Sequence, residues 1–214
     1  MHIEFLDLLR CPKPHEETWL VAALHRMDGR QVIQAKLGCP VCGAEFFIRD
    51  GVALFGDEVD SDNLPVGPTI GGPTVVGDEM ATRIAAFLDL TAPGKLVLLA
   101  GQLAGASDSL AELAEARIVA LNTPSLVPHP VAERVAELLA RPPVPLAAKS
   151  LDGIALDDSH STSEMLTEAA RLLRPRGRLL AGATAELSPE FRELARDTEY
   201  LVAEYVGELV TLRR

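Results

Sequence analysis

Two pairs of potential metal ligands occur within the first 42 residues of the chain. Cys39-Pro40-Val41-Cys42-Gly43 is a C-P-x-C-G turn, in which two thiolates can hold one tetrahedral ion while backbone N–H groups point at the sulfurs. Upstream, Cys11 and His15 are the only soft ligands. The resulting C-x3-H and C-x2-C pattern predicts a zinc site of four ligands: Cys11, His15, Cys39 and Cys42. The alternative is a related fold that keeps buried thiols without a metal.

A second group of polar residues, Asp157-Asp158-Ser159-His160, follows a predicted strand over residues 153–156. In an α/β sheet the carboxyl ends of the strands face the ligand crevice, so two carboxylates and an imidazole could do acid–base work or bind a metal there. The alternative is a helix N-terminus, where Asp and Ser cap the free N–H groups and complement the helix dipole.

The N-terminal ligands require a small β-rich unit over residues 1–55. Its first residues form a short helical turn, and Asp28-Gly29 predicts a hairpin. Strands are expected over residues 18–25, 31–37 and 45–48, which are rich in β-formers or bounded by turn residues. Residues 56–76 are acidic and then rich in Pro and Gly without periodicity, which predicts an interdomain linker.

Residues 77–214 alternate between buried strands and amphipathic helices, which predicts an α/β fold with a mostly parallel sheet and helices on both faces. Strands are expected over residues 95–100, 117–121, 153–156 and 178–181, and an antiparallel terminal hairpin over 200–205 and 208–212. Helices are expected from residue 78, over 107–116, 131–140 and 163–173, and from Ser188-Pro189-Glu190. One strand of the usual set is not visible between residues 140 and 146.

The first 55 residues resemble a known small domain. Leu8-Leu9-Arg10-Cys11-Pro12, the C-P-x-C-G turn and the Ile48-Arg49-Asp50-Gly51-Val52 ending are similar to the zinc ribbon of the activator subunit that partners tRNA and protein methyltransferases. In that family the second ligand of the first pair is a cysteine at the position of Pro14. The resemblance implies a ribbon that covers apolar surface beside a methyltransferase sheet. Because the ribbon is fused here, we expect it to dock in cis.

Residues 77–214 resemble class I methyltransferases that use S-adenosylmethionine (SAM), a Rossmann-like fold. The resemblance lies in LTAPGKLVLLAG (residues 90–101), SLDGIAL (150–156) and EAARLLRPRGRLL (168–180). In that family an acidic residue, any residue and then G-x-G-x-G follow the first strand. An acidic residue that ends the second strand holds the ribose hydroxyls.

At these positions the chain departs from the family. Gly101 and Gly105 are kept, whereas Leu103 replaces the middle glycine, Leu99 the first acidic residue and Asn122 the second. Each missing charge-assisted hydrogen bond is worth about 1.5–3 kcal/mol. The resemblance therefore implies a degenerate SAM site, and Leu103→Gly with Leu99→Asp is expected to raise SAM affinity.

Two functions follow from this site. One is a non-catalytic binding or scaffold protein, an accessory subunit with a protein partner; the alternative is an active SAM-dependent methyltransferase acting on a small molecule or protein. A metal-dependent enzyme using Asp157, Asp158 and His160 is a third hypothesis.

The composition limits the classes of partner that the protein can bind. The net charge of -11 disfavours nucleic acid, because an acidic surface repels phosphates. The one basic cluster, Arg171, Arg174, Arg176 and Arg178, falls in a predicted helix-to-strand turn. We expect no signal peptide, no transmembrane segment and a cytoplasmic location, in which three cysteines indicate metal or free thiols rather than disulfides.

Overall fold

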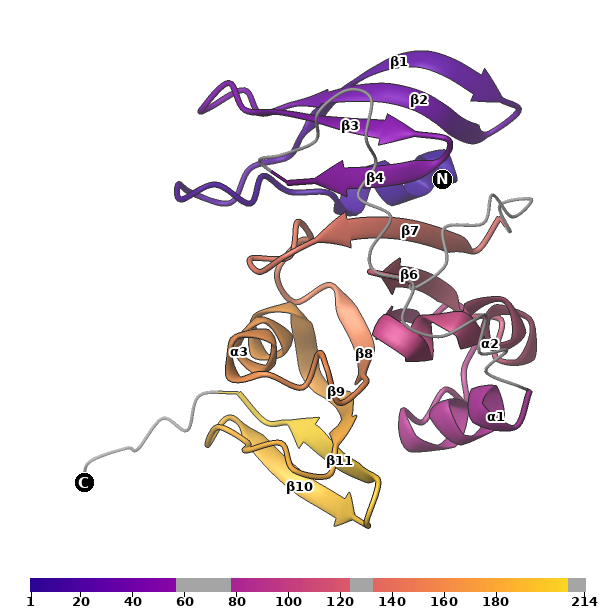
Figure 1. The fold of residues 1–214 in the computed structure, drawn as a ribbon, viewed down its shortest axis with the longest axis vertical. Coiled ribbons are helices and arrows are strands. Elements are labelled where there is room, and N and C mark those ends of the chain that lie inside the picture. The colour runs from indigo at the N-terminus through magenta and orange to yellow at the C-terminus, as the bar shows by residue number, and fades with distance from the viewer. Residues whose placement is uncertain (57–77, 124–132, 208–214) are drawn as a thin grey trace.

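A computed structural model describes residues 1–56, 78–123 and 133–207. Its described strands form one mixed sheet of 11 strands in the order β1-β2-β3-β4-β7-β6-β5-β8-β9-β11-β10 (Figure 1). The N-terminal strands lie at one end of this sheet and the C-terminal strands at the other (Figure 1). The predicted linker and the predicted strand over 208–212 fall outside the described residues. The division into units of 1–55, 56–76 and 77–214 stays a prediction.

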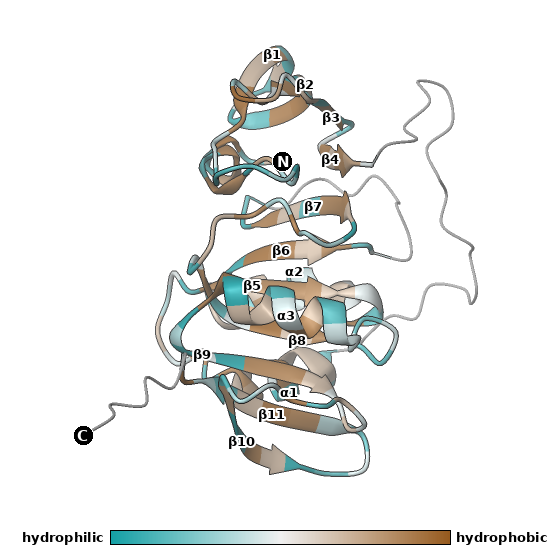
Figure 2. Cartoon of the chain, turned by 90° about the vertical axis from the view of Figure 1, so that its left-hand side faces the viewer, coloured by the Kyte–Doolittle hydropathy of each residue, from teal (hydrophilic) through white to brown (hydrophobic). Residues whose placement is uncertain are grey.

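The middle of the sheet is parallel and buried on both faces. Its strands are β5 (Leu96–Ala100), β6 (Arg117–Leu121), β7 (Val135–Ala140), β8 (Leu151–Leu156) and β9 (Leu173–Gly182). Side chains alternate between the faces, so Leu98 packs into one apolar cluster and Leu99 into the other. Figure 2 shows hydrophobic residues along much of β6 and β7.

Helices cover both faces of this parallel sheet. α1 (Asp78–Phe87) and α2 (Ser107–Leu113) contribute Ile84 and Leu110 to the cluster around Leu99. α3 (Ser163–Leu172) packs Met165 and its neighbours into the opposite cluster. Two antiparallel strands, β11 (Tyr200–Tyr205) and β10 (Phe191–Arg196), complete the C-terminal end of the sheet. The Rossmann-like α/β fold with an antiparallel terminal pair is therefore confirmed. The partners of β11 are β9 and β10, so the predicted hairpin of 200–205 with the segment that follows it is wrong.

The N-terminal unit, residues 1–56, is part of the same sheet. It consists of a 3-10 helix η1 (Ile3–Leu8) and four strands in antiparallel order: β1 (Val21–Asp28), β2 (Gln31–Gly38), β3 (Glu45–Arg49) and β4 (Val52–Phe55). β4 then pairs in parallel with β7, from Val52 opposite Glu137 to Phe55 opposite Ala140. Phe5 and Ile48 share one apolar cluster with Leu138. The unit therefore docks in cis through strand pairing as well as through apolar contact.

Two predicted helices are strands. Residues 131–140 carry apolar side chains at helical spacing, yet 135–140 form β7, because this segment is hydrogen-bonded between β6 and β4. It is the strand that was not visible in the sequence. Similarly, Ser188-Pro189-Glu190 does not open a helix. Phe191 N donates to Ser188 O in a turn, and β10 follows, pairing with β11.

The segment before α2 also differs from expectation. The chain leaves β5 directly into a 3-10 helix η2 (Gly101–Ala106), so Ser107 lies inside the helical segment and its hydroxyl donates to Ala104 O at 2.7 Å. The helix therefore has no side-chain cap at its start. Within the described ranges, no helix is long and apolar enough to cross a membrane.

Candidate functional site

The four predicted zinc ligands converge. One ligand atom from each of Cys11, His15, Cys39 and Cys42 lies within 4.8 Å of every other. Cys39 Sγ is 3.4 Å from His15 Nε2, and Cys11 Sγ is 3.7 Å from Cys42 Sγ. The turn that carries Cys39 is closed by Gly43 N, which donates to Cys39 O at 3.0 Å, and Gly43 takes the left-handed backbone that this turn requires. Three thiols and one imidazole are a tetrahedral donor set suited to zinc.

The surroundings of the cluster shift the pKa values of the two buried thiols in opposite directions. Burial would raise the pKa of Cys39, but hydrogen bonds from the backbone N–H groups of Cys42 and Val41 outweigh it and lower the pKa to about 6. Burial raises the pKa of Cys11 to about 12, and the adjacent thiols of Cys39 and Cys42 add to the rise. The turn therefore favours one thiolate before any ion is bound, as zinc binding requires.

In this fold class, ligands bind in a crevice at the carboxyl ends of the strands. At the carboxyl ends of β5, β6 and β8, the chain's own side chains fill this crevice. Gly101, which follows β5, has φ +63° and lies against the side chains of Asp157 and His160 from the β8–α3 loop. A methyl group on Gly101 would come within 2.1 Å of Asp157 Oδ2 and 2.6 Å of His160 Nδ1. Because glycine has no side chain, Asp157 and His160 of this loop can lie directly against the backbone of Gly101.

Hydrogen bonds hold the loop in that position. Asp157 Oδ2 accepts from Gln102 N at 2.7 Å, and Asp157 Oδ1 accepts from the backbone N of His160 at 3.0 Å and from its Nδ1 at 2.8 Å. A neutral imidazole that donates from Nδ1 accepts at Nε2, where the Asn122 amide lies at 3.5 Å. Asn122 also bridges to β7, since Ala140 N donates to its Oδ1 at 3.0 Å and its Nδ2 donates to Ala140 O at 2.9 Å. Residues after β8, β5 and β6 are thus linked across the crevice.

This arrangement limits acid–base chemistry. Both ring nitrogens of His160 are engaged, and the Asp157 carboxylate binds backbone N–H groups. The Asp158 side chain lies against Gly182 and not against Gly101, since a methyl group on Gly182 would meet its Oδ1 at 2.1 Å. Among the described residues, Asp157, Asp158 and His160 do not form a group of potential metal ligands. Asp157 caps the turn that leads to His160, but it does not cap a helix. The N-cap of α3 is Thr162, whose hydroxyl accepts from Met165 N at 3.3 Å, so the predicted helix N-terminus at Asp157 is wrong.

The other residues compared with a SAM site do not supply polar groups to this crevice. Leu103 is 4% exposed and Leu99 is fully buried, and both pack into the cluster with α1 and α2. Gly105 is exposed in η2. The predicted effect of Leu99→Asp therefore changes: it would bury a carboxylate in the core and destabilise the fold instead of adding a ligand contact.

The sequence did not reveal the contact between His160 and Asn122. These residues are 38 positions apart, and only the topology, which sets β6 and β8 on either side of β5, brings their loops together. The alternation of strands with helices, which predicted a parallel sheet, was the one signal in the sequence that could have suggested this contact.

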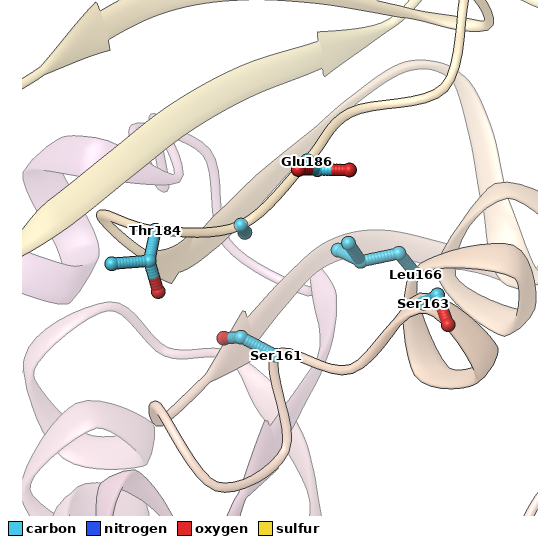
Figure 3. A pocket seen from close by; sticks show the side chains of 6 residues that line it. Ser161, Ser163, Leu166, Thr184 and Glu186 are labelled. Carbon is cyan, nitrogen blue, oxygen red and sulfur yellow. The ribbon is translucent and has the colours of Figure 1, made fainter.

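A shallow pocket of about 230 Å³ lies beside this crevice, between the start of α3 and the residues after β9 (Figure 3). Ser161, at its wall, accepts from Gly182 N at 2.8 Å and donates to Asp157 O at 2.8 Å. This hydroxyl supports the loop. The remaining lining side chains are Ser163, Leu166, Thr184, Ala185 and Glu186.

The Asp157 network is expected to stabilise the protein only above strongly acidic pH. Burial would raise the pKa of Asp157, but hydrogen bonds from His160, Gln102 and Ser159 lower it from 3.8 to about 2. An unfolded chain binds this proton near pH 4, so stability falls as pH drops from about 4 to 2, by no more than about 2 kcal/mol. Urea unfolding of wild type and Asp157→Asn between pH 2 and 7 measures it. A difference between them that stays constant with pH would contradict this assignment.

Comparisons with known proteins give structural likeness alone. No family model and no curated protein matches the chain. Among solved structures, the chain is similar to a putative sarcosine dimethylglycine methyltransferase from Galdieria sulphuraria, with 21% identity over 49% of this chain and 44% of that one, at a TM-score of 0.41. It is also similar to Haemonchus contortus phosphoethanolamine N-methyltransferase 2 (15% identity, 52% of this chain, 30% of that one, TM-score 0.43).

A third similar structure is named for a different reaction. It is the [4+2]-cyclase SpnF, with 18% identity over 49% of this chain and 44% of that one, at a TM-score of 0.41. The chain therefore spans less than half the length of each of these three structures.

Proposed function

We propose that this chain is a methyltransferase-fold protein that does not use SAM and acts as a non-catalytic binding or accessory subunit, with structural zinc in its N-terminal unit. The observation that carries the proposal is the packing of Asp157 and His160 on Gly101. In this fold class, ligands bind outside the carboxyl ends of the strands at the point where the strand order reverses. In this sheet the reversal lies between β5 and β8, where that loop sits.

The residues at this point do not fit SAM. A ligand that approaches the backbone at Gly101 would need the space that the Asp157 carboxylate occupies. Leu99 lies in the core and offers no carboxylate, and the Asn122 amide is already bonded to both backbone groups of Ala140. Loss of two charge-assisted hydrogen bonds weakens binding by about two to four orders of magnitude, before the filled space is counted.

The donor set of the Cys/His cluster does fit zinc, and it fits a structural role. All four tetrahedral positions are supplied by protein side chains, which leaves no open position for a substrate or an activated water. Cys11 and His15 lie on one loop, and Cys39 and Cys42 on another. Bound zinc would add folding energy to the apolar packing of this unit by cross-linking the two loops.

The acidic character of the chain suggests the kind of partner. With a net charge of -11, the protein favours a partner whose surface is basic, and complementary charge would steer their association. We propose a protein partner in the cytoplasm. The second candidate, an active SAM-dependent methyltransferase, would require the β8–α3 loop to leave Gly101 when SAM arrives.

Titration calorimetry with SAM and S-adenosylhomocysteine separates these two functions. We expect no binding of either ligand tighter than about 1 mM at 25 °C, given the missing contacts and the filled space. Zinc added to the chelator-stripped protein in the same instrument serves as the positive control and should bind at one site per chain. Micromolar affinity for SAM would overturn the non-catalytic function.

A further inference from the structure

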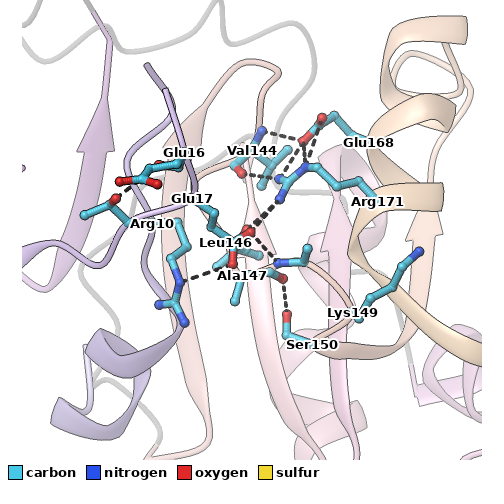
Figure 4. A network of polar contacts seen from close by, with 12 residues as sticks. Arg10, Glu16, Glu17, Val144, Leu146, Ala147, Lys149, Ser150, Glu168 and Arg171 are labelled. Carbon is cyan, nitrogen blue, oxygen red and sulfur yellow. Dashed lines mark hydrogen bonds and ion pairs between the residues drawn. The ribbon is translucent and has the colours of Figure 1, made fainter. Parts of the chain in front are cut away.

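The loop that carries Cys11 and His15 also holds the N-terminal unit to the rest of the molecule. It is closed at its base by Cys11 N, which donates to Thr18 O at 3.0 Å. Between them, Glu17 accepts from Ala148 N at 2.9 Å. Its carboxylate also lies 3.6 Å from Arg10 and 3.7 Å from Arg171 of α3. One loop therefore carries two potential zinc ligands and a contact to the α/β part. Figure 4 shows Glu17 at this contact.

The residues just before this loop pair with the connection between β7 and β8, residues 141–150. Leu9 forms an antiparallel bridge with Leu146. Arg10 N donates to Pro145 O at 2.9 Å, and Ala147 N donates to Leu8 O at 2.9 Å. The connection is thus joined by backbone hydrogen bonds to the segment that leads into Cys11.

From its other side, α3 holds the same connection. Arg171 donates to Val144 O at 2.7 Å and to Leu146 O at 2.9 Å, while Val144 N donates to Glu168 Oε2 at 2.8 Å. Arg171 and Glu168 also form an ion pair at 2.8 Å. The connection lies between two sets of contacts, one from the zinc-ligand loop and one from α3 (Figure 4).

The connection begins next to the crevice. It starts immediately after Ala140, whose two backbone groups bond to the Asn122 side chain. Asn122 in turn contacts His160 Nε2 at 3.5 Å. A short chain of contacts therefore runs from the zinc-ligand loop to the side chains that fill the crevice.

Apolar packing contributes little to the position of the zinc-ligand loop, since its residues from Pro12 to Thr18 are exposed or only partly buried. The Cys11–Thr18 backbone hydrogen bond and the polar contacts of Glu17 hold it together with the four potential ligands. A shared ion would add the strongest of these restraints, so its loss is expected to loosen the loop and Glu17 with it.

We propose that zinc binding locks the β7–β8 connection and thereby holds the crevice closed. The role assigned to the crevice rests on the proposed function, whereas the coupling itself is a property of the contacts. The metal site then acts as a regulator of the α/β part: zinc loss loosens the N-terminal loop, next the connection, and then Asn122 and His160.

Hydrogen exchange on the full chain, resolved to single amides, tests this coupling. Removing zinc with a chelator is expected to speed exchange at Ala148, which donates to the Glu17 carboxylate, by roughly tenfold to a hundredfold, the effect of losing one charge-assisted hydrogen bond. At Arg10, Ala147 and Ala140, which donate to neutral oxygens, the expected increase is about twofold to tenfold. The amides of β5 serve as the internal reference and should not change. If zinc removal speeds exchange only around residues 11–18 and 39–43, the proposal is overturned.

A pair of variants keeps the test decisive if the zinc-free protein does not stay folded. Glu17→Ala should keep one zinc per chain and still speed exchange at Ala147 and Ala148. Glu16→Ala, which removes the neighbouring exposed carboxylate, should change neither. Unchanged exchange in Glu17→Ala would contradict the coupling, whereas SAM binding by the zinc-loaded protein would contradict only the proposed function.

Discussion

Cys39→Ser is expected to release zinc and to destabilise the protein by about 4 kcal/mol or more, since loss of a structural metal is among the largest single-site effects. For an N-terminal unit that is separate from the α/β part, as the sequence predicts, the damage would be expected to stay within residues 1–55. The structure changes that expectation. β4 pairs with β7, and Phe5 and Ile48 share a core with Leu138, so the damage should extend to β7.

Thermal unfolding and elemental analysis of purified protein measure the two effects. Val41→Ser is the matched control, because Val41 lies in the same turn, is 53% exposed and supplies no ligand. It should keep one zinc per chain and a wild-type unfolding temperature. A Cys39→Ser protein that retains both wild-type zinc content and wild-type stability would refute the four-ligand assignment.

Gly101→Ala is expected to cost about 3 kcal/mol. The left-handed backbone of Gly101, φ +63°, costs an alanine about 1–2 kcal/mol. The added methyl would also displace the Asp157 carboxylate and break its hydrogen bonds to Gln102 and His160, at about 1–3 kcal/mol. Urea unfolding provides the measurement.

Gly94→Ala separates the two causes. Gly94 also has a left-handed backbone, φ +77°, but nothing lies within 4 Å of an added methyl, so it should show the backbone cost alone. In an Asp157→Ala background, the cost of Gly101→Ala should fall because the Asp157 carboxylate is gone, but it should stay above the Gly94→Ala cost because His160 Nδ1 still lies 2.6 Å from the added methyl. Equal costs for Gly101→Ala and Gly94→Ala in the wild-type background would mean that Asp157 does not fill the crevice.

Much of the fold could be predicted from local pattern. Short apolar runs such as residues 95–100 and 117–121 mark strands buried on both faces, and the C-P-x-C-G turn predicts a metal site whose four potential ligands do converge. The helix predicted over residues 131–140 is wrong. A segment with apolar residues at helical spacing becomes a strand when neighbouring strands hydrogen-bond to both of its edges, as β4 and β6 do to β7. That pairing partner, β4, is distant in the sequence.

The crevice could be predicted only in part. The replaced positions at 99, 103 and 122 are visible in the sequence, but their consequences depend on packing. Leu103 lies in the core, whereas Asp157 and His160 fill the crevice. The sequence identified these two residues as a capping group or an acid–base pair, and nothing in it indicated that they would rest on Gly101. The contact arises from the order of strands β6, β5 and β8.

The chain's own β8–α3 loop occupies the place where this fold class binds ligands. NMR resonances of the Gly101 amide and the His160 ring nitrogens report on that place. We predict a His160 ring that donates from Nδ1 to Asp157, with resonances of both residues unchanged on adding 1 mM SAM, a concentration about a thousandfold above a micromolar Kd. Saturable shifts of both Gly101 and His160 with SAM would show that the loop yields to the cofactor, and would contradict the account.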